Sequence, residues 1–274
     1  MIVVDDLWFS YPGSSHSLFQ GLSLRVATCS WVVLTGPDGA GKTTLGRLIA
    51  GVYQPTRGKI RIEPTDVGSG CAVGYVGSDP YDYLVGTTVE EDVTFGLENL
   101  GLSSTEITVR LKQALAWTGL QGMEQRLTHS LSGGEQQKLA LASMLAMNAR
   151  VLILDGALCM VDRSTRHSIH SLLQSLRSNP GITIIEVVQN PEEMLQADRL
   201  LFLSQGRIEY DGPPGGFFST GKGRQWCLAA GGLPALRSAL CHKLGNPDAW
   251  RLVDQWEEPE QHYSFLTSSN YLQS

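Results

Sequence analysis

The sequence predicts an α/β fold in which helices flank a mostly parallel sheet. Three observations favour it. Short apolar runs at 31–35, 151–154 and 182–187 are typical of strands that are buried on both faces. A glycine-rich segment follows the first of these runs at 36–43, and helical periodicity dominates residues 88–150. Strands and helices that alternate in this way build a parallel sheet rather than a bundle or a sandwich.

The first sixty residues predict further strands around the glycine-rich segment. Apolar and alternating runs mark them at 2–9, 22–26 and 59–62. A helix is expected directly after the segment, because Leu45, Leu48 and Ile49 recur at helical spacing. Helices are also expected where leucines recur in the middle of the chain, at Leu111, Leu115, Leu120, Leu139, Leu141 and Leu145.

Composition limits the kinds of partner. A chain of 274 residues allows one α/β domain with an appendage, and a net charge of −6 argues against a nucleic-acid partner. No apolar run approaches the roughly 18 residues that span a bilayer, and residues 1–6 lack a basic signal-peptide start, so a membrane role is expected to be peripheral. The five cysteines are odd in number and lack C-x-x-C spacing, which disfavours a disulfide framework or a zinc site.

The glycine-rich segment has the spacing G-x-x-x-x-G-K-[ST] and lies between a predicted strand and a predicted helix. Glycines let backbone N–H groups converge on phosphate oxygens, the lysine neutralises β- and γ-phosphate charge, and the hydroxyl binds Mg²⁺. An ATP site is therefore predicted with Mg²⁺ as its cation. Its residues are Gly36, Pro37, Asp38, Gly39, Ala40, Gly41, Lys42 and Thr43, with Thr44 beside them.

A second motif predicts a second phosphate cradle. Residues 131–135 read Leu-Ser-Gly-Gly-Glu and lead into a helical run, so that Ser132, Gly133 and Gly134 form a small-residue turn at a helix N-terminus. Together with the glycine-rich loop, Leu131 to Glu135 resembles the signature of the ATP-binding cassette (ABC) family. The resemblance covers about the first 210 residues and implies that this signature acts on ATP bound to a second ABC ATPase subunit, in a homodimer or a heterodimer.

The resemblance also implies a domain plan. Residues 1–212 are expected to form a P-loop nucleotide triphosphatase core of ABC type, with an antiparallel β subdomain and a helical subdomain at about 88–150. The Pro-Pro-Gly-Gly run at 213–216 breaks the chain, and residues 213–274 are expected to form a small C-terminal extension, with dimerisation as its candidate role. In that extension Leu233, Leu236, Leu240 and Leu244 could make one apolar helix face.

The wording of residues 83–99 resembles the ATPases of energy-coupling factor importers, the vitamin and cobalt or nickel uptake group. This closer resemblance implies a transmembrane transporter subunit as partner, contacted around residues 78–88. It also implies a cytoplasmic protein that lies peripherally on the inner face of the cell membrane.

The family resemblance assigns three further roles. Tyr11 lies where a ring stacks on adenine, although a strand-end aromatic packed in the core is the alternative reading. Asp155 ends an acidic strand and would hold Mg²⁺ through water, while Thr43 binds the cation directly. Asp162 lies in a turn that passes information across the dimer.

Three departures from the family pattern fall at the γ-phosphate. Gly156 follows Asp155 where a glutamate would polarise the attacking water, Gln189 replaces a histidine, and Ser78 replaces a glutamine that senses Mg²⁺. Loss of a positioned general base costs about 10²- to 10⁴-fold in rate. The sequence therefore predicts a degenerate site with no intact catalytic residue, in which ATP binding survives.

Other residues that could carry a function are expected to have structural roles. His167 and His170 could be metal ligands, but a solvated helix face is preferred because no companion ligand is evident. Cys159 and Met160 are expected to be packing residues, and Trp226, Trp250 and Trp256 to be core anchors or interface residues.

Two functions remain open from the sequence alone. One is an ATP-binding importer subunit whose partner ATPase supplies hydrolysis. The other is a soluble regulatory or assembly protein that uses ATP as a clamp. A small-molecule kinase is a distant third, because it would have no use for the signature at 131–135.

Overall fold

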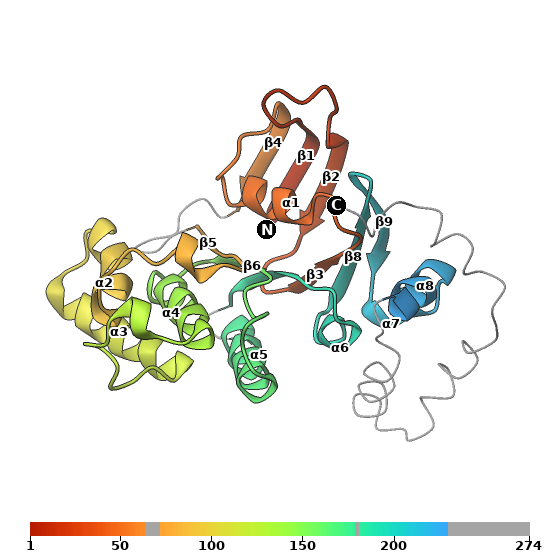
Figure 1. The fold of residues 1–274 in the computed structure, drawn as a ribbon. Helices are drawn as coiled ribbons and strands as arrows, with labels where there is room; N and C mark the ends of the chain where they lie inside the picture. The colour runs from red at the N-terminus through yellow and green to blue at the C-terminus, as the bar shows by residue number, and fades with distance from the viewer. Residues whose placement is uncertain (64–71, 179–180, 230–274) are drawn as a thin grey trace, which may run out of the picture.

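The computed structural model describes residues 1–63, 72–178 and 181–229 of the chain, which are built around a six-stranded sheet (Figure 1). Its strand order is β5-β6-β7-β3-β8-β9, and every neighbouring pair is parallel except the last, β8 with β9. The predicted α/β fold with a mostly parallel sheet is confirmed. The strands are β5 (Val73–Val76), β6 (Val151–Asp155), β7 (Thr183–Val187), β3 (Trp31–Thr35), β8 (Arg199–Ser204) and β9 (Arg207–Gly212).

Alternating side chains of the central strands fill two cores on opposite faces of the sheet. On one face, Ile153 and Ile185 pack in the same core as Leu45 of helix α1 (Lys42–Ile49). On the other face, Leu154 packs in the same core as Leu173 of helix α5 (Arg163–Ser178). Since both faces are covered, each of these strands needs an apolar run and not an alternating one.

A separate antiparallel sheet lies beside α1 (Figure 1). Strand β1 (Ile2–Phe9) is central and pairs with β2 (Phe19–Val26) and β4 (Arg57–Ile62). One face of this sheet, with side chains such as Ile2 and Val26, packs in the core shared with α1.

Three helices form a lobe at the side of the large sheet that β5 borders (Figure 1). They are α2 (Val89–Asn99), α3 (Ser104–Thr118) and α4 (Gly133–Ala146), which share a third apolar core. Each helix begins with a capping box. The side chain of Thr88, Ser103 or Ser132 accepts a hydrogen bond from the backbone N–H of a glutamate three residues later, and the glutamate side chain accepts one from the backbone N–H of the capping residue. Short 3₁₀ turns at Pro80–Asp82 and Thr128–Ser130 precede α2 and α4.

The chain after β9 packs back onto the sheet through α7 (Pro214–Phe218) and α8 (Gly221–Ala229). The Phe217 ring stacks on Phe202 of β8 at 5.1 Å between centroids, and Trp226 meets Phe202 edge-on at 5.6 Å. Trp226 is thus a core anchor. The leucine pattern at 233–244 and the tryptophans at 250 and 256 lie outside the described residues, and the boundary at 212 stays a prediction.

A short helix, α6 (Pro191–Met194), follows β7. Across the described residues, no helix combines the length and the apolar character that crossing a membrane requires.

Candidate nucleotide-binding site

The glycine-rich loop connects β3 to α1, as its sequence predicts. Gly36, Gly39 and Gly41 have φ values of 143°, 75° and 102°, a region that L-residues rarely adopt. At Gly36 a Cβ atom would lie 1.9 Å from the backbone oxygen of Leu203 in β8. The loop therefore has this shape only because its sequence supplies glycine at these positions.

Lys42 begins α1 and turns its ammonium group back over the loop. Its Nζ donates hydrogen bonds to the backbone oxygens of Gly36 at 2.7 Å and Pro37 at 2.8 Å, and lies 3.7 Å from the Asp38 carboxylate. Burial lowers the pKa of Lys42, and the nearby carboxylates of Asp38 and Asp155 oppose that shift. The cation is thus largely desolvated at the place where phosphate charge is expected.

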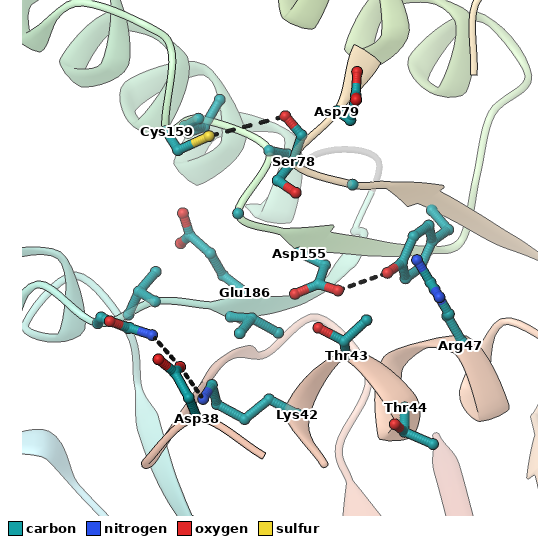
Figure 2. Close-up of a pocket in the computed structure, with 18 of the residues that line it drawn as sticks. Asp38, Lys42, Thr43, Thr44, Arg47, Ser78, Asp79, Asp155, Cys159 and Glu186 are labelled. Atoms are coloured by element: carbon teal, nitrogen blue, oxygen red, sulfur yellow. Dashed lines mark hydrogen bonds and ion pairs between the residues drawn. The ribbon is translucent and has the colours of Figure 1, made fainter. Parts of the chain in front are cut away.

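The side chains predicted to hold Mg²⁺ meet at one cavity. Thr43 of α1 and Asp155 at the end of β6 both line it (Figure 2). A hydroxyl and a carboxylate are hard oxygen donors, and Mg²⁺ in nucleotide sites is commonly held by one or two such groups together with phosphate oxygens. The residues present therefore fit the cation. Asp155 is buried and accepts a hydrogen bond from the Tyr75 hydroxyl at 2.6 Å.

Tyr11 lies on the same cavity, on the side of the antiparallel sheet. Its hydroxyl is 2.6 Å from the Thr44 hydroxyl, and its ring meets Phe9 edge-on at 5.1 Å. Tyr11 is 43% exposed, so the alternative of an aromatic packed in the core is wrong. Stacking of this ring on adenine stays a prediction.

The cavity has a volume of about 720 Å³ and collects most of the predicted nucleotide residues. Asp38, Gly39, Gly41 to Thr44, Asp155 and the three substituted positions Ser78, Gly156 and Gln189 all line it. Gly36, Pro37 and Ala40 shape the loop without lining the cavity.

The backbone at Gly156, directly after β6, has a conformation that is unfavourable for a glutamate or any other residue with a side chain. Gly156 has φ of 66°, in the left-handed region, and a Cβ there would lie 3.2 Å from the Cβ of Ser78. A side chain at 156 would therefore be strained, and would require Ser78 to give way. The lost carboxylate is accompanied by a backbone that disfavours any side chain at this position.

We expect Gly156→Ala to lower the free energy of unfolding by about 1–2 kcal/mol, because L-residues pay roughly that amount in the left-handed region. Gly156→Asn is the matched control, since asparagine tolerates this conformation better, and it should cost less. Urea unfolding of both variants measures the difference. Equal stability of Gly156→Ala and the unmodified chain would mean that the turn is not held left-handed.

Gln189 lies after β7 and binds the glycine-rich loop. Its Nε2 donates to Asp38 Oδ1 at 3.0 Å, and both residues line the cavity. Gln189 cannot become a cation near neutral pH, whereas the histidine expected from the family could.

Ser78 contacts the signature helix instead of reaching into the cavity with a long side chain. Its backbone oxygen accepts a hydrogen bond from Gln137 Nε2 of α4 at 3.1 Å, and Gln137 Oε1 accepts one from the N–H of Met160 at 3.2 Å. Gln137 thus connects α4 to two loops, one after β5 and one after β6. Sequence reasoning missed this buried glutamine, although it lies two residues after the signature at 131–135.

The signature residues lie outside the cavity of their own chain. Ser132 caps α4, and Glu135 Oε2 accepts hydrogen bonds from the Ser132 N–H at 2.7 Å and its hydroxyl at 2.8 Å. These two bonds lower the pKa of Glu135, and Arg126 lies 3.3 Å from its carboxylate. Leu131 is buried, and Gly133 lies beside the Met160 side chain, whose sulfur would be 3.2 Å from a Cβ at that position.

Asp162 caps the start of α5. Its Oδ1 accepts hydrogen bonds from the Thr165 N–H at 3.0 Å and the Ser164 hydroxyl at 2.7 Å, which lower the pKa of this carboxyl. Asp162 does not line the cavity, and its role across a dimer stays a prediction.

Two expectations about this region are wrong. Cys159 and Met160 are exposed and do not pack in the core. The expected solvated face holds for His167, which is exposed, but not for His170, which is buried. His170 is drawn inward because Nε2 lies 3.0 Å from Oε1 of Glu186, a carboxylate that is itself buried on β7.

Glu186 was missed by sequence reasoning, although an acidic residue inside an apolar strand is a signal of a buried polar network. Its second oxygen accepts a hydrogen bond from the indole of Trp31 at 3.0 Å, and the side chain lines the cavity (Figure 2). Arg166 and Glu193 form an ion pair at 2.5 Å close by. Removal of a partner from a buried carboxylate such as Glu186 strongly destabilises the fold, because the charge is then left without compensation.

This pair predicts a pH dependence of stability. Burial lowers the pKa of His170, but the hydrogen bond and charge of Glu186 outweigh it, so the net pKa lies above 6.5. A raised folded-state pKa gives stability that is fully present below the unfolded value and is lost as pH rises through the folded value.

We therefore expect the unmodified chain to exceed His170→Gln in unfolding free energy by more at about pH 6 than at about pH 8.5. Glutamine can still donate to Glu186 but does not titrate, and urea unfolding at both pH values measures the gap. A gap that stays constant or widens at high pH would contradict the charged pair.

Comparison with known proteins agrees with the fold and with the family resemblance. Residues 19–158 match the ABC transporter family, and the chain belongs to that family. It is 33% identical over 216 residues to the energy-coupling factor transporter ATP-binding protein EcfA of Syntrophomonas wolfei, covering 76% of this chain and 79% of that protein. It is 35% identical over 229 residues to EcfA1 of Leuconostoc mesenteroides, covering 81% and 84%.

Among solved structures, cbiO1 of Clostridium perfringens, described as part of the ABC transporter complex cbiONQ, superposes with a TM-score of 0.70. It is 26% identical and covers 83% of this chain and 94% of cbiO1. The resemblance to ABC cassettes, and to energy-coupling factor ATPases among them, is confirmed.

Proposed function

We propose that this chain is the ATP-binding subunit of an energy-coupling factor-like importer, with an impaired hydrolytic site of its own. It binds MgATP at the interface with a second ABC ATPase, which hydrolyses ATP and drives transport. The observation that carries this proposal is an intact phosphate loop facing a strand end, Asp155-Gly156, without a second carboxylate.

Binding uses groups that are all present. Loop N–H groups and Lys42 would hold the phosphates, and Thr43 and Asp155 would hold Mg²⁺. When bound, Mg²⁺ would neutralise charge on the phosphate oxygens. The three substituted positions, Gly156, Gln189 and Ser78, are not among these groups. The departures from the family pattern therefore leave the binding of MgATP in place.

Hydrolysis requires a group that orients and deprotonates water, and Gly156 has no side chain to do so. Gln189 hydrogen-bonds Asp38 but does not titrate near neutral pH, so it cannot act as a general acid or base. The site is therefore expected to turn over about 10²- to 10⁴-fold more slowly than a complete one. A homodimer would have Gly156 in both sites, so we propose a heterodimer with a complete ATPase.

The position of the signature supports the partner role. Ser132, Gly133 and Gly134 lie at the N-terminus of a 14-residue helix, outside the cavity of this chain. Such a turn favours phosphate oxygens, so it would complete the ATP site of the partner.

Three exposed apolar side chains, which we propose form one docking surface, support a transmembrane partner. Tyr81 and Val85, near Ser78, and Phe95 on α2 are 70%, 62% and 51% exposed. Relatives named as energy-coupling factor transporter ATPases, and one described as part of an ABC transporter complex, match most of this chain. The protein is therefore proposed to lie on the cytoplasmic face of the membrane, docked through this surface.

Co-purification tests the docking. The chain is co-expressed with the second ATPase and the polytopic membrane subunit that neighbouring genes encode. Phe95→Glu should then reduce the amount of this chain that is captured on membranes, while ATP binding persists. Val109→Glu is the matched control, since Val109 is 59% exposed on α3. An assembly that survives Phe95→Glu would remove this docking surface. A chain that binds its partner ATPase but never the membrane subunit would favour a soluble regulatory clamp.

A further inference from the structure

A tyrosine holds the carboxylate that the ATP site needs for its cation. Tyr75 is the third residue of β5, and its hydroxyl donates to Asp155 Oδ2 at 2.6 Å. Both residues are buried, and the bond joins two neighbouring strands at residues 80 positions apart in the sequence. A hydrogen bond to a carboxylate at this length is of the strong, charge-assisted kind.

The tyrosine is itself fixed by neighbours on the cavity wall. The ring of Tyr83 lies 5.9 Å from that of Tyr75, and Gly77 makes room for it, since a Cβ at 77 would lie 2.3 Å from the Tyr83 hydroxyl oxygen. Arg47 of α1 hydrogen-bonds the Tyr53 hydroxyl at 3.1 Å and interacts with the Tyr75 phenol. The phenol therefore has little freedom to leave Asp155.

The consequence concerns the other oxygen of Asp155. With Oδ2 bound to Tyr75, the carboxylate has a fixed rotation, and Oδ1 is directed away from the phenol (Figure 2). Orientation matters more in this chain because Ser78 stands where the family resemblance predicts a glutamine near the cation. Partners that orient a ligand in this way typically contribute 10- to 100-fold to metal affinity.

We propose that Tyr75 is a positioning residue for Mg²⁺, which acts by orienting Asp155. The inference rests on the proposed function, because it needs MgATP at this cavity. It is separate from hydrolysis and concerns only the coupling between cation and nucleotide.

The experiment compares ATP binding to the full chain with excess Mg²⁺ and with excess EDTA, using a fluorescent ATP analogue. The ratio of the two dissociation constants measures the coupling of Mg²⁺ to nucleotide. Tyr75→Phe keeps the ring in place and removes the hydroxyl. It should lower that ratio by about tenfold and leave binding in EDTA unchanged.

Two further variants separate positioning from general damage. Tyr83→Phe keeps the ring that contacts Tyr75 and removes only a hydroxyl that makes no hydrogen bond to Asp155, so it should keep the ratio of the unmodified chain. In an Asp155→Asn background, Tyr75→Phe should add no further loss, because a residue that acts through Asp155 has no effect once the carboxylate is gone. Thermal unfolding of each variant confirms that it is folded.

An unchanged ratio in Tyr75→Phe with normal binding in EDTA would overturn the role of Tyr75 and leave the proposed function intact. A loss that persists in Asp155→Asn would also overturn it, because Tyr75 would then act by another route. If the unmodified chain bound ATP in neither condition, the proposed function itself would fall, and the inference with it.

Discussion

Lys42→Ala is expected to lower ATP affinity by about 100-fold, equivalent to about 2.8 kcal/mol at 1.4 kcal/mol per tenfold. The ammonium group is buried among backbone oxygens of the loop, where its attraction to phosphate is screened less than at an exposed site. A charge-assisted hydrogen bond alone is worth about 1.5–3 kcal/mol. Equilibrium binding of ATP to the purified variant measures this loss.

Lys112→Ala provides the matched control, because Lys112 is an exposed lysine on α3. It should bind ATP as the unmodified chain does. If Lys42→Ala retained full affinity, the loop would not be the phosphate site, and neither the proposed function nor its heterodimer could stand.

Ser132→Arg is expected to lower turnover of the mixture with the partner ATPase by at least about 100-fold. The arginine would fill the turn that is proposed to receive the γ-phosphate of the partner, and loss of preorganised donors at a reacting oxyanion costs about 10²- to 10³-fold. ATP binding by this chain should persist, because Ser132 does not line its own cavity. Turnover and binding are measured on the same mixture.

Ser103→Arg is a close control for that substitution. Ser103 caps α3 through the same arrangement that Ser132 uses at α4, with Glu106 in the place of Glu135. Its replacement should remove a cap worth about 1 kcal/mol without affecting turnover. Equal losses in both variants would mean that helix stability, and not the signature, limits the activity of the mixture.

The sequence was most informative where one local signal determines the structure. The strand at 31–35 was predicted to the residue, since an apolar run that ends at a glycine-rich loop indicates a buried strand with a defined end. The run at 2–9 was equally clear. The sequence shows that glycine at 156 leaves this position without a carboxylate. The left-handed φ of Gly156 depends on the turn that follows β6 and cannot be inferred from residue type.

The parts that could not be predicted depend on contacts between distant elements. His170 has helical neighbours that suit a solvated face, yet it is buried because Glu186 of β7 faces it. Tyr75 gave no sign of its bond to Asp155, because the pairing of β5 with β6 sets that distance. A single sequence shows which residues are polar but not which of them meet across a sheet.

MgATP binding and turnover, measured on one sample of the purified chain, would show whether it binds ATP without hydrolysing it efficiently. We expect saturable MgATP binding, with turnover about 10²- to 10⁴-fold below that of a complete partner ATPase. Turnover by the chain alone at the rate of a complete site would contradict it. Another group would then supply the water-activating function that Gly156 lacks.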